Sequence, residues 1–471
     1  MSSMHNVAGH VRSPEAVLEV GLRVPFGWAA KPVVPGEGNV TELHWERQDA
    51  LLSDHARLRI TVAVDVRDNK RIEVFALGTG SVLGTLDIRF AHVFQLYELP
   101  LPLSAALAAV KKGIGLRMTE GDSPLWFFVQ DEAAGLREPV LMPHLMIGSS
   151  GEAAAAFNQR LDSLASIQQF GWMEGCVLDG LMDSGFTATA RKHLDLYVKE
   201  NELIYEDPRS RPCDGSFYGI ESTLPIAMLT KLEPTHPLVE KAVAYMASHA
   251  DGHGIIKDGD TLSAEGSYTI GYPLAVIAAR RKDKQLAEIA FKQLILRRDL
   301  LWESGALFLR RQDDGTRTFR NWGRAYAWHL LGLIRSLEEL RGKGLLTADQ
   351  EQLIEEEFVH TLRQAYRFRD EHGLWSCFLD EPVTGVDTSA SAGIAAAAAI
   401  SSRIGIRPYS ECGDATLSAT SLLRYLTPDG LVTGTAQSNK NGEELQRSGY
   451  RVISQMTMGL LGQLLAAIGP Q

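Results

Sequence analysis

The chain has 471 residues, of which 22% are charged and 45% hydrophobic, and its formal net charge is −11. This length suits two or three domains. An acidic chain without a basic tract argues against nucleic-acid binding through phosphate contacts. No apolar run approaches the length of a membrane span, and residues 1–20 lack the apolar core of a secretory signal. We therefore expect a cytoplasmic protein without a membrane or nucleic-acid partner.

Metal-binding residues do not form a recognisable motif. The four cysteines, Cys176, Cys213, Cys377 and Cys412, contain no CxxC pair, and the histidines form neither an HExxH motif nor a tight triad. No GxxxxGK phosphate loop is present. The sequence predicts no metal and no cofactor, and it favours the cysteines as small core residues.

The first predicted domain, residues 1–147, has a β pattern. Alternating or β-branched and aromatic runs occur at residues 57–66, 71–77, 82–90, 92–99 and 125–129, separated by glycine and proline. One short alanine-rich helix is predicted at residues 105–111. Many short strands with turn signals favour a β-sandwich or an open barrel. We expect a sandwich that serves as an accessory domain, with carbohydrate binding as the alternative role.

The second predicted domain, residues 148–471, follows a small, polar link at residues 148–151 and has helical periodicity to its end. Helices are predicted at residues 152–170, 186–201, 220–232, 238–250, 265–282, 285–302, 322–341, 348–369, 390–404, 409–426 and 452–468. Paired helices that close into a ring bury one face each, and no fixed sequence period indicates an open solenoid. The predicted fold class is therefore mainly α: an (α/α)6 toroid preceded by an N-terminal β-sandwich.

Four connecting segments combine aromatic residues with acids or arginines. They are residues 211–221, 258–268, 319–328 and 373–392. Loops on a rigid scaffold often carry function. We expect these segments to form an acidic central cleft with an aromatic rim.

These segments resemble glycoside hydrolase families 88 and 105, the unsaturated uronyl hydrolases, over about residues 171–471. The similar pieces follow the same order: residues 220–225 (IESTLP), 264–268 (AEGSY), 321–328 (NWGRAYAW) and 373–392 (GLWSCFLDEPVTGVDTSASA). The chain departs from the family pattern at three positions. Glu221 and Glu265 stand where the family has aspartates, and Leu309 stands where it has a histidine.

The resemblance implies a hydrolase that hydrates the C4–C5 double bond of an unsaturated uronic acid at the non-reducing end of an anionic oligosaccharide, releasing the next sugar. Glu265 is then expected to be the general acid/base and Glu221 its partner. Such catalysis needs a carboxyl with a raised pKa. Because a helix N-terminus favours the anion, repulsion or desolvation must raise it. The alternative is that each glutamate is a plain helix-terminal charge.

Aromatic rings and guanidinium groups are expected to bind the sugar. Arg324 suits the substrate carboxylate, although a structural arginine is the alternative. The aromatic candidates are Trp172, Tyr218, Tyr268, Trp322, Trp328 and Trp375, and Arg447 is expected to close the cleft. Aromatic residues at helical spacing are more often part of a core.

Three other functions remain open. An ordinary glycosidase would use Glu221 and Glu265 as acid and base on saturated glucuronides. A lyase on the same toroid is disfavoured because the sequence has no obvious Tyr/His base pair, and a non-catalytic sugar-binding toroid is disfavoured because both carboxylates are retained. The oligomeric state is also open, with a homodimer as one option.

Overall fold

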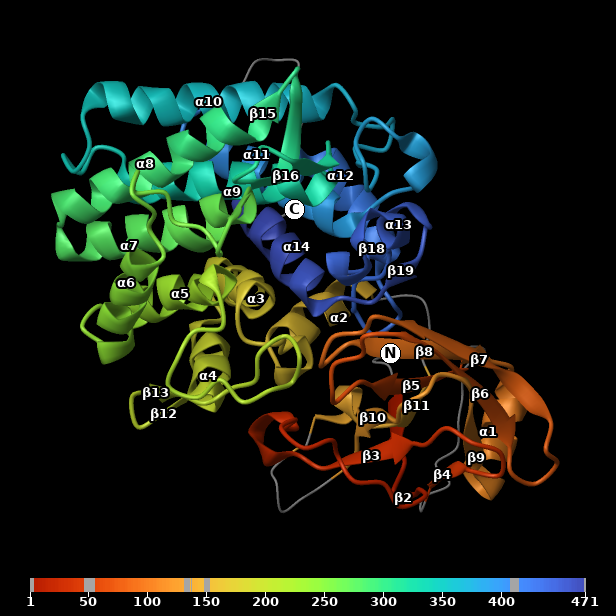
Figure 1. The fold of residues 1–471 in the computed structure, drawn as a ribbon. Helices are drawn as coiled ribbons and strands as arrows, with labels where there is room; N and C mark the ends of the chain where they lie inside the picture. Colours follow the sequence, from red (N-terminus) through yellow and green to blue (C-terminus); the bar gives the residue numbers. More distant parts are fainter. Residues whose placement is uncertain are drawn as a thin grey trace.

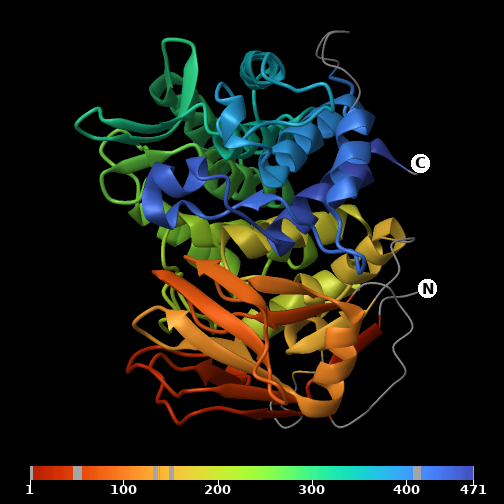
Figure 2. The same cartoon turned by 90° about the vertical axis from the view of Figure 1, so that its right-hand side faces the viewer.

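The computed structural model describes residues 4–45, 56–130, 136, 138–147, 153–406 and 415–469. A β-rich N-terminal region lies against a larger helical region (Figure 1, Figure 2). The predicted link at residues 148–151, the first residues of the predicted helices at 152–170 and 409–426, and Cys412 lie outside the described residues. No described helix is both long and apolar enough to cross a lipid bilayer.

Two antiparallel sheets make up most of the N-terminal region. The first has the order β1 (Met4–Val7), β11 (His144–Ile147), β5 (Ala56–Thr61), β8 (Leu96–Leu101), and the second the order β2 (His10–Arg12), β4 (Thr41–His44), β9 (Ile114–Glu120), β6 (Asn69–Ala76), β7 (Val82–Arg89). A separate pair joins β3 (Ala30–Val33) to β10 (Leu125–Phe128), and α1 (Leu103–Lys112) contacts β4, β5 and β6. Both sheets contribute to one core, which includes Leu58, Ile72, Ile88 and Leu116.

Six helices form a closed inner ring in the described part of the chain. They are α3 (Trp172–Asp183), α5 (Leu224–Leu232), α7 (Tyr272–Arg281), α9 (Gly323–Leu340), α11 (Thr388–Arg403) and α14 (Gln455–Ile468). Each contacts the next, and α14 contacts α3, which closes the ring. The predicted helical toroid is confirmed.

Each inner helix has an outer neighbour. The pairs are α3 with α4 (Thr187–Tyr197), α5 with α6 (Pro237–Ser248), α7 with α8 (Lys284–Leu301), α9 with α10 (Ala348–Tyr366), α11 with α12 (Ala415–Leu422) and α14 with α2 (Ala153–Leu161). A short helix, α13 (Gly442–Arg447), lies between α12 and α14. The loops at the two ends of these helix pairs therefore bring together side chains that are far apart in the sequence.

Helix α3 was not predicted from the sequence. Its residues from Met173 to Leu181 are all buried, so it lacks the polar face that gives amphipathic periodicity. Gly175 and Gly180 also lower the intrinsic helix propensity of this segment. A Cβ on Gly180 would overlap the backbone of Gly459 in α14, so this glycine allows the first and last inner helices to touch.

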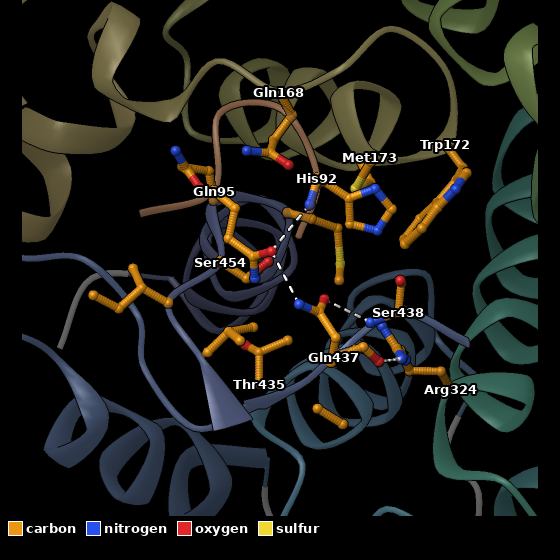
Figure 3. A pocket seen from close by; sticks show the side chains of 15 residues that line it. His92, Gln95, Gln168, Trp172, Met173, Arg324, Thr435, Gln437, Ser438 and Ser454 are labelled. Carbon is orange, nitrogen blue, oxygen red and sulfur yellow. Dashed lines mark hydrogen bonds between the residues drawn. The ribbon is translucent and has the colours of Figure 1, made fainter. Parts of the chain in front are cut away.

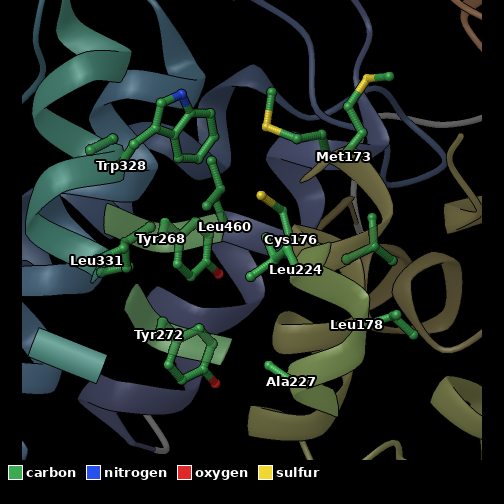
Figure 4. Close-up of a cluster of buried hydrophobic side chains, with 14 of the residues drawn as sticks. Met173, Cys176, Leu178, Leu224, Ala227, Tyr268, Tyr272, Trp328, Leu331 and Leu460 are labelled. Atoms are coloured by element: carbon green, nitrogen blue, oxygen red, sulfur yellow. The ribbon is translucent and has the colours of Figure 1, made fainter. Parts of the chain in front are cut away.

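Side chains fill the interior of the ring, so it is not a pore. Figure 4 shows Trp328, Tyr268 and Tyr272 along the inside, facing α3 and α5. The hydroxyls of Tyr268 and Tyr272 both donate to Asp179. The Arg335 guanidinium lies 3.7 Å from Asp179, which balances the buried carboxylate. A substrate can therefore be bound only at an end of the ring.

A continuous core joins the N-terminal region to the ring. Phe94 and Phe128 of the N-terminal region stack with ring centroids 5.3 Å apart and belong to the same buried cluster as the inner helices. Arg59 of β5 donates two 2.8 Å hydrogen bonds to Asp429, in the loop that follows α12 and its 3-10 extension, and both side chains are fully buried. The two regions thus pack as one body.

Candidate active site

The inner helices begin at one end of the ring, which we call the ring mouth. Glu221, Glu265, Arg324 and Trp172 all lie at or just before the start of an inner helix: α5, α7, α9 and α3 respectively. Residues far apart in the sequence are therefore brought to the same end of the molecule. The N-terminal region covers part of this end through the loop at residues 90–95.

Glu221 and Glu265 form a carboxyl pair at the ring mouth. Glu221 lies in the 3-10 turn η4 (Ile220–Thr223) that leads into α5, and Glu265 lies two residues before the π-helical turn η5 (Ser267–Gly271) that leads into α7. Glu265 is buried and Glu221 is partly exposed. The two carboxyls hydrogen-bond each other, and desolvation, then the charge of Glu265, raises the pKa of Glu221 well above its ordinary value. The expected pairing of these two glutamates is therefore present in the fold.

Glu221 lies within an irregular helical turn and Glu265 lies just before one, so neither is at the start of a plain α-helix. The predicted helix at residues 265–282 starts with a π-helical turn, η5 (Ser267–Gly271), before α7 continues. The predicted helix at residues 220–232 starts with η4. Irregular turns of this kind are frequent at functional sites, because they re-aim side chains that regular helix would place elsewhere.

Asp258 is a third carboxylate beside the pair, and sequence reasoning gave it no role. Its Oδ1 accepts a 3.1 Å hydrogen bond from the backbone N–H of Ile220, which fixes the start of η4 and with it Glu221. Desolvation raises the pKa of Asp258, and the charge of Glu265 adds to this. Asp258 in turn helps to raise the pKa of Glu221.

Arg310 is the cation that acts on this pair. It lies on β16 (Ala306–Gln312), directly opposite Ser263 of β14 (Thr261–Ser263), two residues before Glu265. Its positive charge opposes the rise in the pKa of Glu221. Among the described residues Arg310 has no ion-pair partner, whereas Arg317 of the neighbouring strand pairs with Glu303.

Leu309 stands where the resemblance places a histidine, and its surroundings contain an arginine at the next position. The Leu309 side chain is fully buried, and its carbonyl accepts a 2.8 Å hydrogen bond from the N–H of Ala264. The chain is thereby fixed beside Glu265. Arg310, the next residue, is partly exposed, with its guanidinium 5.6 Å from the centre of the Phe319 ring. In the sequence, Arg310 could have been singled out by its position directly after Leu309, which stands where the family has a histidine.

Arg324 is not available as the open carboxylate ligand that the sequence suggested. It is only 2% exposed. Its Nη2 donates to the carbonyl of Gln437 at 2.6 Å and to Oε1 of Gln446 at 3.2 Å. Its Nε lies 3.8 Å from Asp387, and its guanidinium stacks over Trp322 at 4.5 Å. Its Nη2 is therefore committed to the protein, whereas its buried Nε has no hydrogen-bond partner among the described residues.

Four of the predicted aromatic candidates lie inside the protein. Trp322, Trp328, Tyr268 and Trp375 are at most 3% exposed. Trp375 donates its indole N–H to the carbonyl of Ala365, and Trp322 donates to Gln446. These rings contact other buried groups in the structure and do not form an open rim.

Trp172 and Tyr218 are the two predicted aromatics that keep exposed surface. Trp172 contacts Trp328 edge-on at 5.6 Å between ring centroids. Tyr218 packs its hydroxyl against Gly171, and burial, together with the charge of Glu221, raises its pKa. Tyr218 therefore lies near the carboxyl pair, and Trp172 lies at the cavity described below.

Arg447 lies apart from the carboxyl pair, in an ion-pair cluster of its own. Its guanidinium pairs with Glu381 at 3.0 Å and with Glu443. It also stacks over Phe378 at 3.8 Å. These contacts account for its position without a ligand.

A small cavity lies at the ring mouth (Figure 3). Trp172 in its wall follows Gly171, which packs against the hydroxyl of Tyr218, three residues before Glu221. Trp172, Met173 and Arg324 of the ring and His92 and Gln95 of the N-terminal region line the cavity. Neither glutamate lines it, so the predicted single cluster of acids, guanidinium and indoles is divided into two neighbouring parts. His92 was placed in a predicted strand at residues 92–99, but β8 begins only at Leu96.

The chain is similar to known carbohydrate-active proteins. Residues 268–468 match the model of Glycosyl Hydrolase Family 88, a segment that begins just after Glu265. Over 151 residues the chain is 31% identical to the "Unsaturated rhamnogalacturonyl hydrolase YesR" of Bacillus subtilis (strain 168); this match spans 31% of the chain and 41% of that relative. The resemblance found in the sequence motifs is confirmed.

Solved structures share the fold. A protein from Salmonella enterica described as a possible member of the GH105 family superposes with a TM-score of 0.58 at 15% identity, covering 68% of this chain and 94% of that one. A family 105 glycoside hydrolase from C. acetobutylicum superposes with a TM-score of 0.53 at 15% identity, covering 66% and 97%. These likenesses support the toroid as the shared architecture.

Proposed function

We propose that this protein is a glycoside hydrolase that hydrates the 4,5-unsaturated uronyl residue at the non-reducing end of an anionic oligosaccharide and releases the next sugar. The observation that carries the proposal is the hydrogen-bonded Glu221–Glu265 pair at the ring mouth, where burial and like charge raise the pKa of Glu221. The family 88 match and the similarity to an unsaturated rhamnogalacturonyl hydrolase support it.

The proton needed for the first step is held by Glu221. Because its pKa is raised, this carboxyl is protonated at pH values where ordinary carboxyls are ionised. It donates the proton to C4 of the double bond, and a water oxygen bonds to C5 while Glu265 accepts the water proton. The resulting hemiketal opens by breaking the C5–O5 bond, and loss of the C1 substituent then releases the next sugar. From the sequence, Glu265 was expected to be the general acid/base with Glu221 as its partner; in this scheme Glu221 supplies the acid and Glu265 the base.

Arg310 is proposed to bind the uronyl carboxylate in place of Arg324. It is the partly exposed cation beside the pair and has no carboxylate partner in the described chain, whereas Arg324 is buried and committed to Gln437 and Gln446. A charge-assisted contact there would also orient C4 and C5 over the carboxyls.

The carboxyl separation disfavours an ordinary glycosidase acting on saturated glucuronides. That chemistry needs its two carboxyls roughly 5–5.5 Å apart for retention, or about 6.5–9.5 Å apart for inversion. Glu221 and Glu265 are in direct hydrogen-bond contact instead. One shared proton on a close pair suits protonation of a double bond better than a nucleophile and acid on opposite sides of a glycosidic bond.

The N-terminal region is proposed to be an accessory β-sandwich, with the domain division at residues 1–147 and 148–471. The shared core of its two sheets supports this arrangement. A cytoplasmic location and a homodimeric assembly stay predictions.

The assay uses unsaturated disaccharides generated by a polysaccharide lyase and follows the ultraviolet absorbance of the conjugated double bond. The wild type is expected to remove this absorbance. Glu221→Gln and Glu265→Gln should each lower kcat by at least about a hundredfold, in line with general acid–base catalysis, while circular dichroism and Tm show an intact fold. Persistent absorbance with the wild type, alongside release from a saturated aryl glucuronide, would replace this proposal with the glycosidase alternative.

A further inference from the structure

The small cavity at the ring mouth, which Trp172 lines, is built jointly by the two regions of the chain. His92 and Gln95 come from the loop between β7 and β8, and Arg324, Ser438 and Gln455 come from the ring (Figure 3). Its volume of about 20 Å³ has room for roughly one water-sized group. A cavity of this size can take a hydroxyl but not a whole sugar ring.

Several buried polar atoms around this cavity have no partner in the described structure. They are both ring nitrogens of His92, Nε of Arg324, Oγ of Ser438 and Oε1 of Gln455. All four side chains are at least nine-tenths buried. Buried polar atoms are nearly always hydrogen-bonded, so four unpaired residues around one cavity indicate a polar group that completes them.

The loop that carries His92 is held rigidly against the ring. Oε1 of Gln95 accepts hydrogen bonds from the N–H of His92 at 3.1 Å and from Nε2 of Gln437 at 3.0 Å. Nε2 of Gln455 donates to the carbonyl of Phe94 at 2.8 Å. Phe90 and Phe94 adopt left-handed backbone conformations, with φ of 49° and 67°, which bulky residues rarely adopt. A strained loop fixed in this way pre-positions the imidazole.

The charges around the cavity favour a neutral ligand group over a carboxylate. Burial, followed by the charges of Lys440, Arg67 and Arg324, lowers the pKa of His92 well below its ordinary value. The neutral imidazole then offers one donor and one acceptor, which matches a hydroxyl. The charge of Arg324 is already balanced by Asp387 at 3.8 Å. The cavity therefore suits a neutral group, whereas the guanidinium of Arg310, which has no ion-pair partner among the described residues, suits a carboxylate.

We propose that this cavity is a subsite for a ring hydroxyl of the uronyl sugar, and that His92 of the N-terminal region is a substrate-binding residue. The inference rests on the proposed function. The partly exposed Trp172 forms one wall and offers a face for the sugar ring. A 4,5-unsaturated uronyl ring keeps hydroxyls only at C2 and C3, so one of these two enters the cavity and displaces water. The N-terminal region thus completes the site.

The test compares wild type and His92→Phe on an unsaturated aryl uronide and on its 2-deoxy and 3-deoxy analogues. The wild type should lose about tenfold in kcat/KM on one of the two analogues, because that analogue leaves buried polar groups unpaired. His92→Phe should lose about tenfold on the parent compound and show a much smaller further loss on that same analogue. Its Tm should stay close to that of the wild type, since an apolar ring replaces an unpaired imidazole.

His144→Phe is the matched control, because His144 is also a buried histidine of the N-terminal region but does not line the cavity. It should keep the wild-type ranking of parent and deoxy compounds. Equal penalties for the deoxy analogues in wild type and His92→Phe would overturn the subsite. If the wild type leaves the parent uronide intact, the proposed function fails. In that case, calorimetry measures the binding of the same three compounds to wild type and His92→Phe. A loss of affinity for one deoxy analogue that is large in the wild type and much smaller in His92→Phe supports the subsite, and equal losses overturn it.

Discussion

Glu221 is the residue whose environment sets the pH behaviour of the site. Desolvation, Glu265 and Asp258 raise its pKa, and Arg310 lowers it. An acid catalyst needs this balance, because its carboxyl must hold a proton at the working pH and still release it to the substrate. The neighbouring charges are therefore as important to the chemistry as the carboxyl itself.

Arg310→Gln tests both roles of this arginine. Loss of a charged contact to the substrate carboxylate should raise KM by roughly ten- to a hundredfold, equivalent to about 1.5–3 kcal/mol. Loss of its positive charge should also move the alkaline limb of the kcat–pH profile to higher pH, because Glu221 then holds its proton more tightly. Arg311→Gln is the control, since neighbouring strand residues point to opposite faces. If Arg310→Gln leaves both KM and the alkaline limb of the kcat–pH profile unchanged, Arg310 neither binds the substrate nor acts on Glu221.

The raised pKa of Glu221 also affects stability. Below its ordinary pKa of 4.5 the carboxyl is protonated in both the folded and the unfolded chain. Above 4.5, up to the raised folded value, only the folded protein keeps the proton, so the free energy of unfolding falls as pH rises through this window. Glu221→Gln should remove this contribution, giving a flatter dependence of the unfolding free energy on pH in urea titrations. Parallel curves for variant and wild type would contradict the raised pKa.

At the scale of elements, close backbone contacts place the inner helices. Gly180 of α3 and Gly459 of α14 lie so close that a Cβ on either would overlap the backbone of the other helix. The same is true of Gly332 in α9 against Ser267 in the π-helical turn after Glu265. Glycine at these three positions lets helices distant in the sequence approach closely, which in turn fixes the geometry of the ring mouth.

Gly459→Ala should therefore destabilise the protein by about 1–3 kcal/mol, because overpacking forces α14 away from α3. Gly252→Ala serves as the control, since an added Cβ there meets no atom within 4 Å. Urea unfolding should show little change, within about 0.5 kcal/mol, for the control. Equal stabilities of the two variants would mean that the α3–α14 contact is not tight.

At the scale of the whole molecule, the N-terminal region and the ring share one buried core and a buried ion pair. Arg59 is fully buried and hydrogen-bonded to Asp429 and Glu98. Arg59 holds the pKa of Asp429 well below its ordinary value, although burial opposes this. Such a junction couples the two regions, so that they are expected to unfold in one transition.

Arg59→Met should cost roughly 3–5 kcal/mol, because it removes the fully buried cation that pairs with Asp429, which then keeps only His5 and the more distant Arg160, at 3.7 Å, as ion-pair partners among the described residues. Arg57→Met is the matched control. Arg57 pairs with the same Glu98 but keeps a side-chain exposure of 32%, so its loss should cost at most about 1 kcal/mol. Calorimetry should show a lower Tm for Arg59→Met than for the control. Two separate transitions in the wild type would show that the regions unfold independently.

The sequence by itself determined the type of fold and the identity of the paired acids. Helical periodicity after about residue 150 predicted the toroid, because each outer helix must bury one stripe and expose the other. Motif order placed Glu221 and Glu265 at the starts of α5 and α7. Helix α3 was missed for the opposite reason: it is buried on nearly all sides and carries Glu174 and Asp179 in its interior positions, so its polar residues do not mark a solvent-facing stripe. The short strands β1 to β4 and β11 were missed because few residues per strand carry the alternating pattern.

Only the tertiary structure decided which side chains surround the acids. Strand pairing between β14 and β16 brings Arg310 to the carboxyl pair, and the packing of the loop at residues 90–95 brings His92 to the ring mouth. The same packing buries Trp322, Trp328, Tyr268 and Trp375, which the sequence could not separate from rim residues. Residue type and spacing report local periodicity, whereas contacts between distant segments depend on how the ring closes and on what covers it.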